Sequence, residues 1–372
     1  MKKKHLPLKI FLSVLALLLA VVVGYVIYVF AAWYRVEDNQ ALEVDWPDVD
    51  CITASVEKGR TYRTASYNIG FGAYSDDYSF FMDGGTESRA RSAQAVRENV
   101  SGAMDAVMKL DPDFLLLQEV DVGGTRSYHV DELAQVRDAW DRIGVNCFST
   151  FAQNYDSPYL FWPLAAPHGA NRAGLAVLSR HCIDSAVRRQ LPIEDGFMKL
   201  VDLDRCYSVQ RIPMAYEGGA EPDGRELVLY NLHLSAYTSD GTIAEEQLKM
   251  LFADMLSEYE KGNYAVAGGD FNKDLLGNSE EIFGISGPEY TWAQPIPPEL
   301  IPEGLSIIAP FDGADPVPSC RNADRPYGPD NYVVTVDGFI VSANIEVLNA
   351  KVCDTGFRWS DHNPVYMDFI LK

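Results

Sequence analysis

The feature that most constrains the fold of this chain is an apolar run near its N-terminus. The residues from Ile10 to Trp33 include no charged side chain. At about 1.5 Å of rise per residue, a helix of this length crosses a hydrocarbon core of about 30 Å. A single segment in lipid satisfies its backbone hydrogen bonds only as a helix. We therefore predict one transmembrane helix over residues 10–33.

The residues around this run predict its orientation. The basic segment Lys2-Lys-Lys4 precedes it, so residues 1–9 are expected to form a cytoplasmic tail and the rest to be exported. Tyr25, Tyr28 and Tyr34 fit an aromatic belt at the outer interface. The alternative is a cleaved signal peptide with Val29-Phe-Ala31 at the cleavage site, but the run exceeds the usual signal core of about 7–15 residues. We expect a single-pass protein of the cell membrane.

The remainder of the chain predicts one folded unit. Residues 34–60 are acidic and weakly patterned, and we expect them to form a stalk. From residue 61 to residue 372, apolar segments typical of buried strands alternate with two helical patterns, at residues 86–110 and from Thr242 onward. Such alternation predicts a single α/β domain.

Composition limits the partners of this domain. Hydrophobic residues make up 47% of the chain, which supports a sizeable core. The net charge is −22, and all charges in residues 1–35 are positive, so the remainder is more acidic still. An acidic surface repels nucleic acid at long range, although a local basic pocket or a bound metal reverses the field at a site. A nuclease is therefore disfavoured without being excluded.

Six cysteines are spread along the chain, at positions 51, 147, 182, 206, 320 and 353. None of them has the spacing of a structural zinc site. Cys182 and Cys206 flank neighbouring predicted strands and are the expected disulfide pair. The alternative is six free thiols, most of them buried.

Polar side chains recur where the predicted strands end. Because strand ends converge on one rim in layered α/β folds, we expect these residues to form one site. Carboxylates, amides and histidines without a catalytic Ser or Cys motif favour metal-assisted hydrolysis. The residues concerned are Asn68, Gln118, Glu119, His233, Asp270, Asn272, Asp337, Asp361 and His362.

The order of these motifs resembles that of the endonuclease/exonuclease/phosphatase superfamily, which includes deoxyribonucleases, neutral sphingomyelinases and inositol polyphosphate phosphatases. The resemblance covers about residues 61–372 and implies a four-layer α-β-β-α sandwich, in which helices flank two packed mixed sheets. The matching motifs are Ser66-Tyr-Asn68, Leu117-Gln-Glu119, Gly174-Leu-Ala-Val-Leu-Ser179, Asn231-Leu-His233, Gly269-Asp-Phe-Asn272, Val336-Asp-Gly-Phe-Ile340 and Ser360-Asp-His362.

The resemblance implies a metal site. Glu119 is expected to bind a catalytic Mg²⁺, with Mn²⁺ or Ca²⁺ as alternatives, because carboxylate oxygen is a hard ligand for a hard cation. Asn68 is expected beside it, holding the carboxylate or a phosphate oxygen, and Asp361 is expected to support the metal.

The resemblance also implies catalytic roles. Asp270 is expected to orient or deprotonate the attacking water, and Asn272 to donate to the phosphate. His362 is expected to face the phosphorus, with Asp337 holding its other ring nitrogen. His233 matches the leaving-group side, as a general acid.

Other residues bear on the substrate. Gly70 replaces the acidic residue that abasic-site endonucleases have two places after the first Asn, which favours the deoxyribonuclease and sphingomyelinase patterns. Arg126 is expected to clamp a second anionic group, the alternative being a solvated loop arginine. Tyr128 and Arg321 are also expected to contact substrate. Trp292 and Ile307-Ile308, on the long proline-rich segment 284–331, are candidates for membrane contact.

We therefore expect a membrane-anchored, metal-dependent hydrolase of phosphate esters, acting as a monomer on a small molecule or a lipid head group. One alternative is an extracellular nuclease, which would need a basic groove. An alternative of another class is a non-catalytic surface-binding module, which the full set of catalytic positions disfavours.

Overall fold

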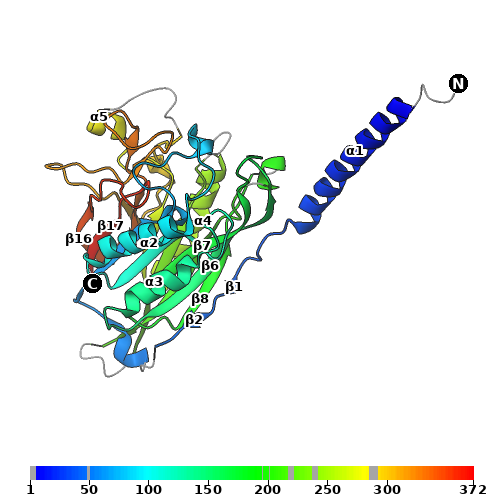
Figure 1. Ribbon diagram of the computed structural model, residues 1–372. Coiled ribbons are helices and arrows are strands. Elements are labelled where there is room, and N and C mark those ends of the chain that lie inside the picture. Colours follow the sequence, from blue (N-terminus) through cyan, green and yellow to red (C-terminus); the bar gives the residue numbers. More distant parts are fainter. Residues whose placement is uncertain are drawn as a thin grey trace.

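A computed structural model describes residues 6–47, 51–194, 196–200, 202–216, 222–236, 242–284 and 292–372. Helix α1 (Leu6–Ala32) extends away from a layered domain, with the N-terminus at its far end (Figure 1). Among the described residues one helix, Pro7–Ala32, is long and apolar enough to cross a membrane. The predicted cytoplasmic tail, residues 1–9, includes residues 1–5, which lie outside the described residues, and the first turn of α1.

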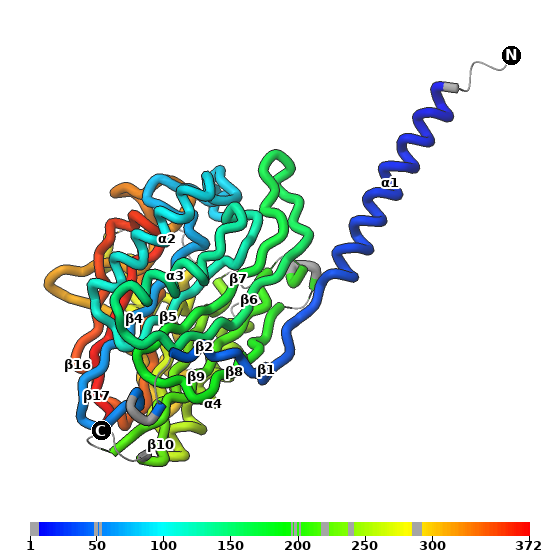
Figure 2. Tube along the Cα trace, turned by 60° about the horizontal axis from the view of Figure 1, so that its bottom comes forward, coloured from blue at the N-terminus to red at the C-terminus, as the bar shows by residue number. Residues whose placement is uncertain are grey.

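One sheet of the domain is mixed and has seven strands, in the order β16-β17-β4-β5-β7-β6-β2 (Figure 2). Its only parallel pair among the described residues is β4 with β5. The strands are β2 (Val44–Asp45), β4 (Thr61–Asn68), β5 (Phe114–Asp121), β6 (Phe148–Leu160), β7 (Gly169–Ser179), β16 (Ile345–Val352) and β17 (Val365–Leu371).

The second sheet is also mixed, with β10 parallel to β11, and runs in the order β1-β8-β9-β10-β11-β15-β12, with β3 paired to β9. Its strands are β1 (Gln40–Ala41), β3 (Val56–Glu57), β8 (Ser185–Gln190), β9 (Cys206–Ala215), β10 (Pro222–His233), β11 (Tyr264–Asp270), β12 (Leu305–Ile308) and β15 (Asp337–Ser342). A separate small pair joins β13 (Cys320–Arg321) to β14 (Val333–Val334).

Alternation along the strands builds the layers. In β5, Phe114 and Leu116 pack into the core between the two sheets, whereas Leu115 and Leu117 face helices α2 (Ala93–Met108) and α3 (Glu132–Asp141). Successive strand residues point to opposite faces, so one strand serves both cores. Both helices cover the outer face of this sheet in Figure 1.

Helix α4 (Thr242–Glu260) covers the outer face of the second sheet. Leu248, Leu251 and Met255 form its buried stripe, as their spacing of three and four predicts, and a short helix α5 (Ser279–Phe283) follows β11. The four-layer α-β-β-α sandwich is thereby confirmed. The helix predicted over residues 86–110 is shorter, because the Ser92 side chain caps it by accepting from the Ala95 N–H at 3.1 Å.

The segment expected to be a stalk belongs to the folded domain instead. It contributes β1, β2 and β3, which pair with β8, β6 and β9 respectively. Arg35 also forms an ion pair with Asp204, with Nε 2.7 Å from Oδ1. The expectation of a stalk over residues 34–60 is wrong for these strands, because two-residue strands leave too little periodicity to detect in sequence.

The expected disulfide is also corrected. Cys182 pairs with Cys51, with Cα atoms 5.2 Å apart, and not with Cys206, which is a free, buried thiol. Cys51 lies on the short 3₁₀ helix η1 (Cys51–Ala54). The Cys182 N–H donates to the Ala54 carbonyl, and this hydrogen bond holds η1 near the start of β8. This pairing spans 131 residues and has no local signal.

Candidate active site

Strand register brings the polar strand ends together. His233 at the end of β10 lies opposite Asp270 at the end of β11, and Asp270 lies opposite Asp337 at the start of β15. In the other sheet, Asn68 at the end of β4 lies opposite Gln118, next to Glu119. The two packed sheets therefore present these side chains to one pocket, as expected from the strand ends.

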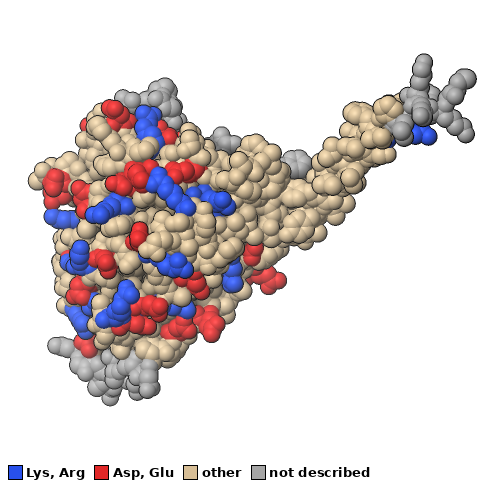
Figure 3. All heavy atoms as spheres, in the orientation of Figure 1, with Lys and Arg blue, Asp and Glu red and all other residues tan. Residues whose placement is uncertain are grey.

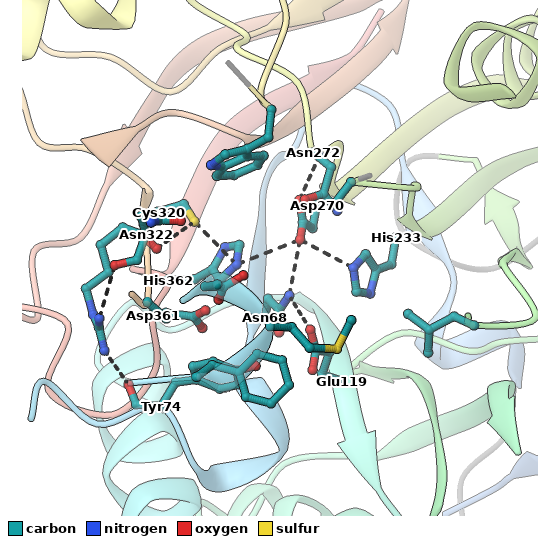
Figure 4. Close-up of a pocket in the computed structure, with 18 of the residues that line it drawn as sticks. Asn68, Tyr74, Glu119, His233, Asp270, Asn272, Cys320, Asn322, Asp361 and His362 are labelled. Carbon is teal, nitrogen blue, oxygen red and sulfur yellow. Dashed lines mark hydrogen bonds and ion pairs between the residues drawn. The ribbon is translucent and has the colours of Figure 1, made fainter. Parts of the chain in front are cut away.

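Asn68 joins the two sheets across this pocket. Its Nδ2 donates to Asp270 Oδ2 at 3.1 Å and lies 3.4 Å from Glu119 Oε1 (Figure 4). Its Oδ1 accepts from the Gly70 N–H at 3.0 Å. The amide therefore holds carboxylates, which is one of its two expected roles, and its oxygen is turned away from the metal-binding side.

Glu119 reaches the pocket through a local irregularity of β5. The pairing of β5 with β7 shifts register between Leu117 and Val120, and Glu119 has a φ of +54°. A left-handed conformation costs a non-glycine residue about 1–2 kcal/mol, and bulges of this kind re-aim side chains next to active sites. The surrounding strands enforce the conformation.

Gly70 is glycine for a steric reason. Its φ is +52°, and an added Cβ would lie 2.7 Å from the Tyr74 ring and 3.3 Å from Asp361 Oδ1. The acidic residue found at this position in abasic-site endonucleases therefore has no room here. Asp361 occupies that side of the pocket instead, as Figure 4 shows.

His362 and Asp337 form the expected contact, with Nδ1 2.8 Å from Oδ2. The same Asp337 oxygen accepts from Ser319 Oγ at 2.7 Å. Burial lowers the pKa of His362, but Asp337 and Cys320 outweigh it and raise that pKa well above its ordinary value. The Nε2 atom points into the pocket, 3.8 Å from Asp270 Oδ2.

Asp270 lies at the centre of the cluster. Burial, and then the Asp337 charge, raise the pKa of Asp270 to about 7, against the lowering effect of His362. Its Oδ2 lies 3.5 Å from His233 Nε2, while its Oδ1 accepts from the Asn272 N–H at 2.8 Å. Burial, and then the nearby Arg205, lower the pKa of His233 well below its ordinary value.

The pocket offers two sets of metal ligands. Glu119 and Asp361 are half-buried, and desolvation raises the pKa of each carboxyl. Two half-buried carboxylates with raised pKa values fit a hard divalent cation, which would neutralise them. Ligand atoms of Asp270, Asp337 and His362 also lie within 4.8 Å of one another, but two of these three are already hydrogen-bonded to each other.

The three residues expected to bind substrate differ in placement. Arg126 lines the pocket but is buried, donates from Nη2 to Asp121 at 2.7 Å and stacks 4.0 Å from the centre of the Phe71 ring. The alternative of a solvated loop arginine is therefore wrong. Arg321 also lines the pocket, yet its Nη2 donates to backbone carbonyls such as that of Ser75, at 2.9 Å. Tyr128 is exposed and lies outside the pocket lining.

Several further residues line or support the pocket, and of these His168 and Arg205 were not singled out by any sequence motif. Ser319 supports Asp337, Cys320 Sγ lies 3.6 Å from His362 Nε2, and His168, Tyr155 and Arg205 form part of the wall. Asn272 does line the pocket, with Nδ2 donating to the Leu234 carbonyl at 2.8 Å. Ser319 and Cys320 adjoin Arg321 in sequence, which is the one local signal that pointed to them.

The residues expected to touch a membrane are half-buried. Trp292 lines the pocket, and Ile307 and Ile308 belong to β12, an edge strand that pairs with β15.

The sequence profile of the Endonuclease/Exonuclease/phosphatase family matches residues 65–362, most of the chain. The chain belongs to this family. Members of the endonuclease/exonuclease/phosphatase family hydrolyse phosphoesters and generally use divalent metals. No curated protein matches the chain closely.

Solved structures of family members share the fold at low identity. An endonuclease/exonuclease/phosphatase from Beutenbergia cavernae is 18% identical, with a TM-score of 0.52, over 84% of this chain and 72% of that one. ANGEL2, a 2',3'-cyclic phosphatase, is 17% identical with a TM-score of 0.53, over 89% and 98%. The human Nocturnin catalytic domain, with bound sulfate, is 17% identical with a TM-score of 0.50, over 88% and 98%.

Proposed function

We propose that this family member is a membrane-anchored, Mg²⁺-dependent phosphoesterase whose domain lies outside the cytoplasm and acts on a small molecule or a lipid head group. The observation that carries the proposal is the cluster around Asp270, which joins Asn68, His233 and His362 within hydrogen-bond or ion-pair distance. All residue types that phosphoester hydrolysis needs meet there.

Glu119 and Asp361 would hold the cation. A bound divalent cation supplies charge stabilisation to the phosphate oxygens. Asn68 fixes the carboxylates of Glu119 and Asp270, so the cation site and the water site are coupled through one amide.

Asp270 and His362 would act on the water and the phosphate. Asp337 would accept from the Nδ1–H of His362 and favour the imidazolium form, so Nε2 would present a proton to the pocket. Asn272 and His233 lie on the β10–β11 side. Asn272 would donate to the phosphate, and His233 would donate a hydrogen bond to the leaving-group oxygen.

Location outside the cytoplasm rests on two independent features. The basic segment before α1 favours retention of the N-terminus in the cytoplasm. The Cys51–Cys182 disulfide supports the same side, because disulfides persist in oxidising compartments.

Turnover by the full chain in detergent with Mg²⁺ tests the proposal. The substrates are a chromogenic phosphodiester, a phosphomonoester, DNA and sphingomyelin. We expect hydrolysis of a small phosphoester or the lipid, with DNA a poor substrate because of the acidic surface. Preferential cleavage of DNA would favour the nuclease alternative.

A matched pair of variants tests the cation site. Glu119→Gln removes a pocket carboxylate, whereas Glu346→Gln changes an exposed glutamate on β16. We expect Glu119→Gln to lower turnover by roughly 10³-fold or more, through loss of metal charge stabilisation, and to weaken Mg²⁺ binding measured by calorimetry. Glu346→Gln should retain both. A Glu119→Gln protein with more than about a tenth of wild-type turnover contradicts the assignment.

A further inference from the structure

The connection between β6 and β7 is an uncharged hairpin on an otherwise acidic chain. From Ser157 to Asn171 the sequence contains no Asp, Glu, Lys or Arg. Its tip, residues 161–168, exposes three large apolar side chains, with Phe161 51%, Trp162 59% and Leu164 70% exposed. Three such side chains in a row on a loop mark an interaction surface rather than scattered surface hydrophobics.

This β6–β7 tip lies against the N-terminal helix. The ring of Phe161 packs edge-on against Tyr25, with centroids 4.7 Å apart, and the Tyr25 hydroxyl donates to the Tyr159 carbonyl. Tyr28 packs edge-on against Tyr159, with centroids 6.4 Å apart. Two residues of α1, one turn apart, are thus in contact with the hairpin.

The depth of these contacts follows from helix geometry. If the hydrophobic span begins at Ile10, after Lys9, then about 30 Å of hydrocarbon is crossed by Val29. Tyr25 lies four residues before that point, or about 6 Å inside the boundary. Phe161, packed on Tyr25, reaches the same level.

The surroundings agree with this placement. In Figure 3 the upper part of the domain surface beside α1 is tan, whereas acidic and basic side chains lie below the inner end of α1 and over the rest of the visible face. Further from the tip, polar groups begin where the membrane surface would lie: the Trp33 indole donates to the Lys199 carbonyl at 3.0 Å, and the Tyr34 hydroxyl donates to Asp156 at 2.8 Å. Amphipathic rings of this kind favour the head-group region.

We propose that the β6–β7 tip is a second membrane contact, inserted into the leaflet that α1 leaves, with Phe161, Trp162 and Leu164 in the acyl region. This inference rests on the proposed anchoring by α1. The tip contacts the lipid bilayer itself, because α1, which touches the tip, holds the tip at the depth of the bilayer.

Insertion has a consequence for the pocket. Tyr155 on β6 and His168, the last residue of the tip, belong to the pocket wall. The loop residues Asp202 and Leu203 border both the pocket and the cleft beside Trp33. A tip held in lipid therefore keeps the pocket close to the membrane surface, where esters embedded in the bilayer are presented.

Tryptophan quenching in the full chain tests the proposal. The wild type, Trp162→Phe and Trp46→Phe are each reconstituted in phosphatidylcholine vesicles and in vesicles whose acyl chains are brominated. Trp46 directly follows β2, packs against Phe148, is 50% exposed and serves as the matched control. Bromine quenches only indoles within the acyl region. We expect the quenched fraction of the fluorescence to fall in Trp162→Phe and to stay equal or rise in Trp46→Phe.

Two further readouts separate the outcomes. A quenched fraction in Trp162→Phe equal to that of the wild type overturns the proposal. Shielding of Trp162 from aqueous acrylamide without bromine quenching also overturns it, since protein such as a second copy would then cover the tip. Turnover of a soluble phosphodiester is measured in the same vesicles, so loss of enzymatic activity with quenching intact contradicts the proposed function and leaves the tip inference standing.

Discussion

Asp337 illustrates how single residues are held in this site. Its carboxylate is fully buried in β15, where an unpaired charge is costly, and one oxygen is shared by the Ser319 hydroxyl and the His362 ring. The backbone N–H groups of Val336 and Asp337 both donate to the Ser319 hydroxyl oxygen, at 2.9 and 3.0 Å. Ser319 is therefore a positioning residue for the pair.

A double-mutant cycle tests whether Asp337 and His362 act as one unit. We expect Asp337→Asn and His362→Ala each to lower kcat by about 10²-fold or more, because each removes the oriented imidazole. The double variant should be little slower than the worse single variant, since residues acting together are not additive. Rate losses that multiply in the double variant would show independent roles. Steady-state kinetics of the four proteins decide the matter.

At the scale of elements, helix α2 is coupled to the loop that carries His362. Gly102 lies on the buried face of α2, and an added Cβ would be 2.4 to 2.6 Å from three atoms of the Trp359 ring. Trp359 directly precedes Ser360, whose hydroxyl donates to the Asn68 carbonyl at 2.7 Å. The glycine thus permits the close packing of α2 on the site loop.

The variant Gly102→Ala measures this packing. Helix propensity alone predicts a gain of about 1 kcal/mol, whereas overpacking against a rigid indole costs typically about 1–3 kcal/mol. We expect the cost of overpacking to exceed the gain in helix propensity, so that Gly102→Ala has a lower thermal midpoint and a lower kcat. The neighbouring Ser101→Ala, which is not fully buried, should leave both nearly unchanged. A thermal midpoint raised by Gly102→Ala would show that the loop moves freely.

The disulfide also links elements that are far apart in the sequence. It closes a span of 131 residues between η1 and the start of β8, and long-range crosslinks typically contribute about 2–5 kcal/mol. We expect the double variant Cys51→Ser/Cys182→Ser to have a lower thermal midpoint than the wild type. Dithiothreitol should lower the thermal midpoint of the wild type and leave that of the double variant unchanged. Cys353→Ser, at a free thiol, should keep the dithiothreitol effect. A wild-type midpoint insensitive to dithiothreitol would contradict this contribution.

For the whole molecule, the boundary between α1 and the domain decides which fragments fold. Removal of residues 1–32 leaves β1, β2, β3 and Cys51 in place, whereas removal of residues 1–60 deletes all four. We expect the shorter deletion to give a soluble protein with wild-type turnover of a soluble phosphodiester. The longer deletion should unfold at a clearly lower temperature or aggregate, because it exposes strand edges. Equal thermal midpoints for the two fragments would show that the early strands add nothing.

Local patterns in the sequence predicted an α/β domain, and the resemblance of the ordered motifs to a known family implied the four layers and most of the candidate site. Buried strands and the three-and-four spacing of α4 are signals confined to a few residues, and the order of polar strand ends identified Asn68, Glu119, Asp270 and His362 before any coordinates. Sheet register brings the strand ends to one rim, so the positions of polar residues at strand ends were enough to predict that they cluster.

Only the tertiary structure decided contacts between distant or weakly patterned segments. The Cys51–Cys182 bond and the pairing of β1, β2 and β3 with β8, β6 and β9 all depend on partners that no local periodicity identifies. The placement of the β6–β7 tip beside Tyr25 is of the same kind. Partners that meet only after the chain has closed long loops leave no mark on neighbouring residues, and the packed fold alone specifies them.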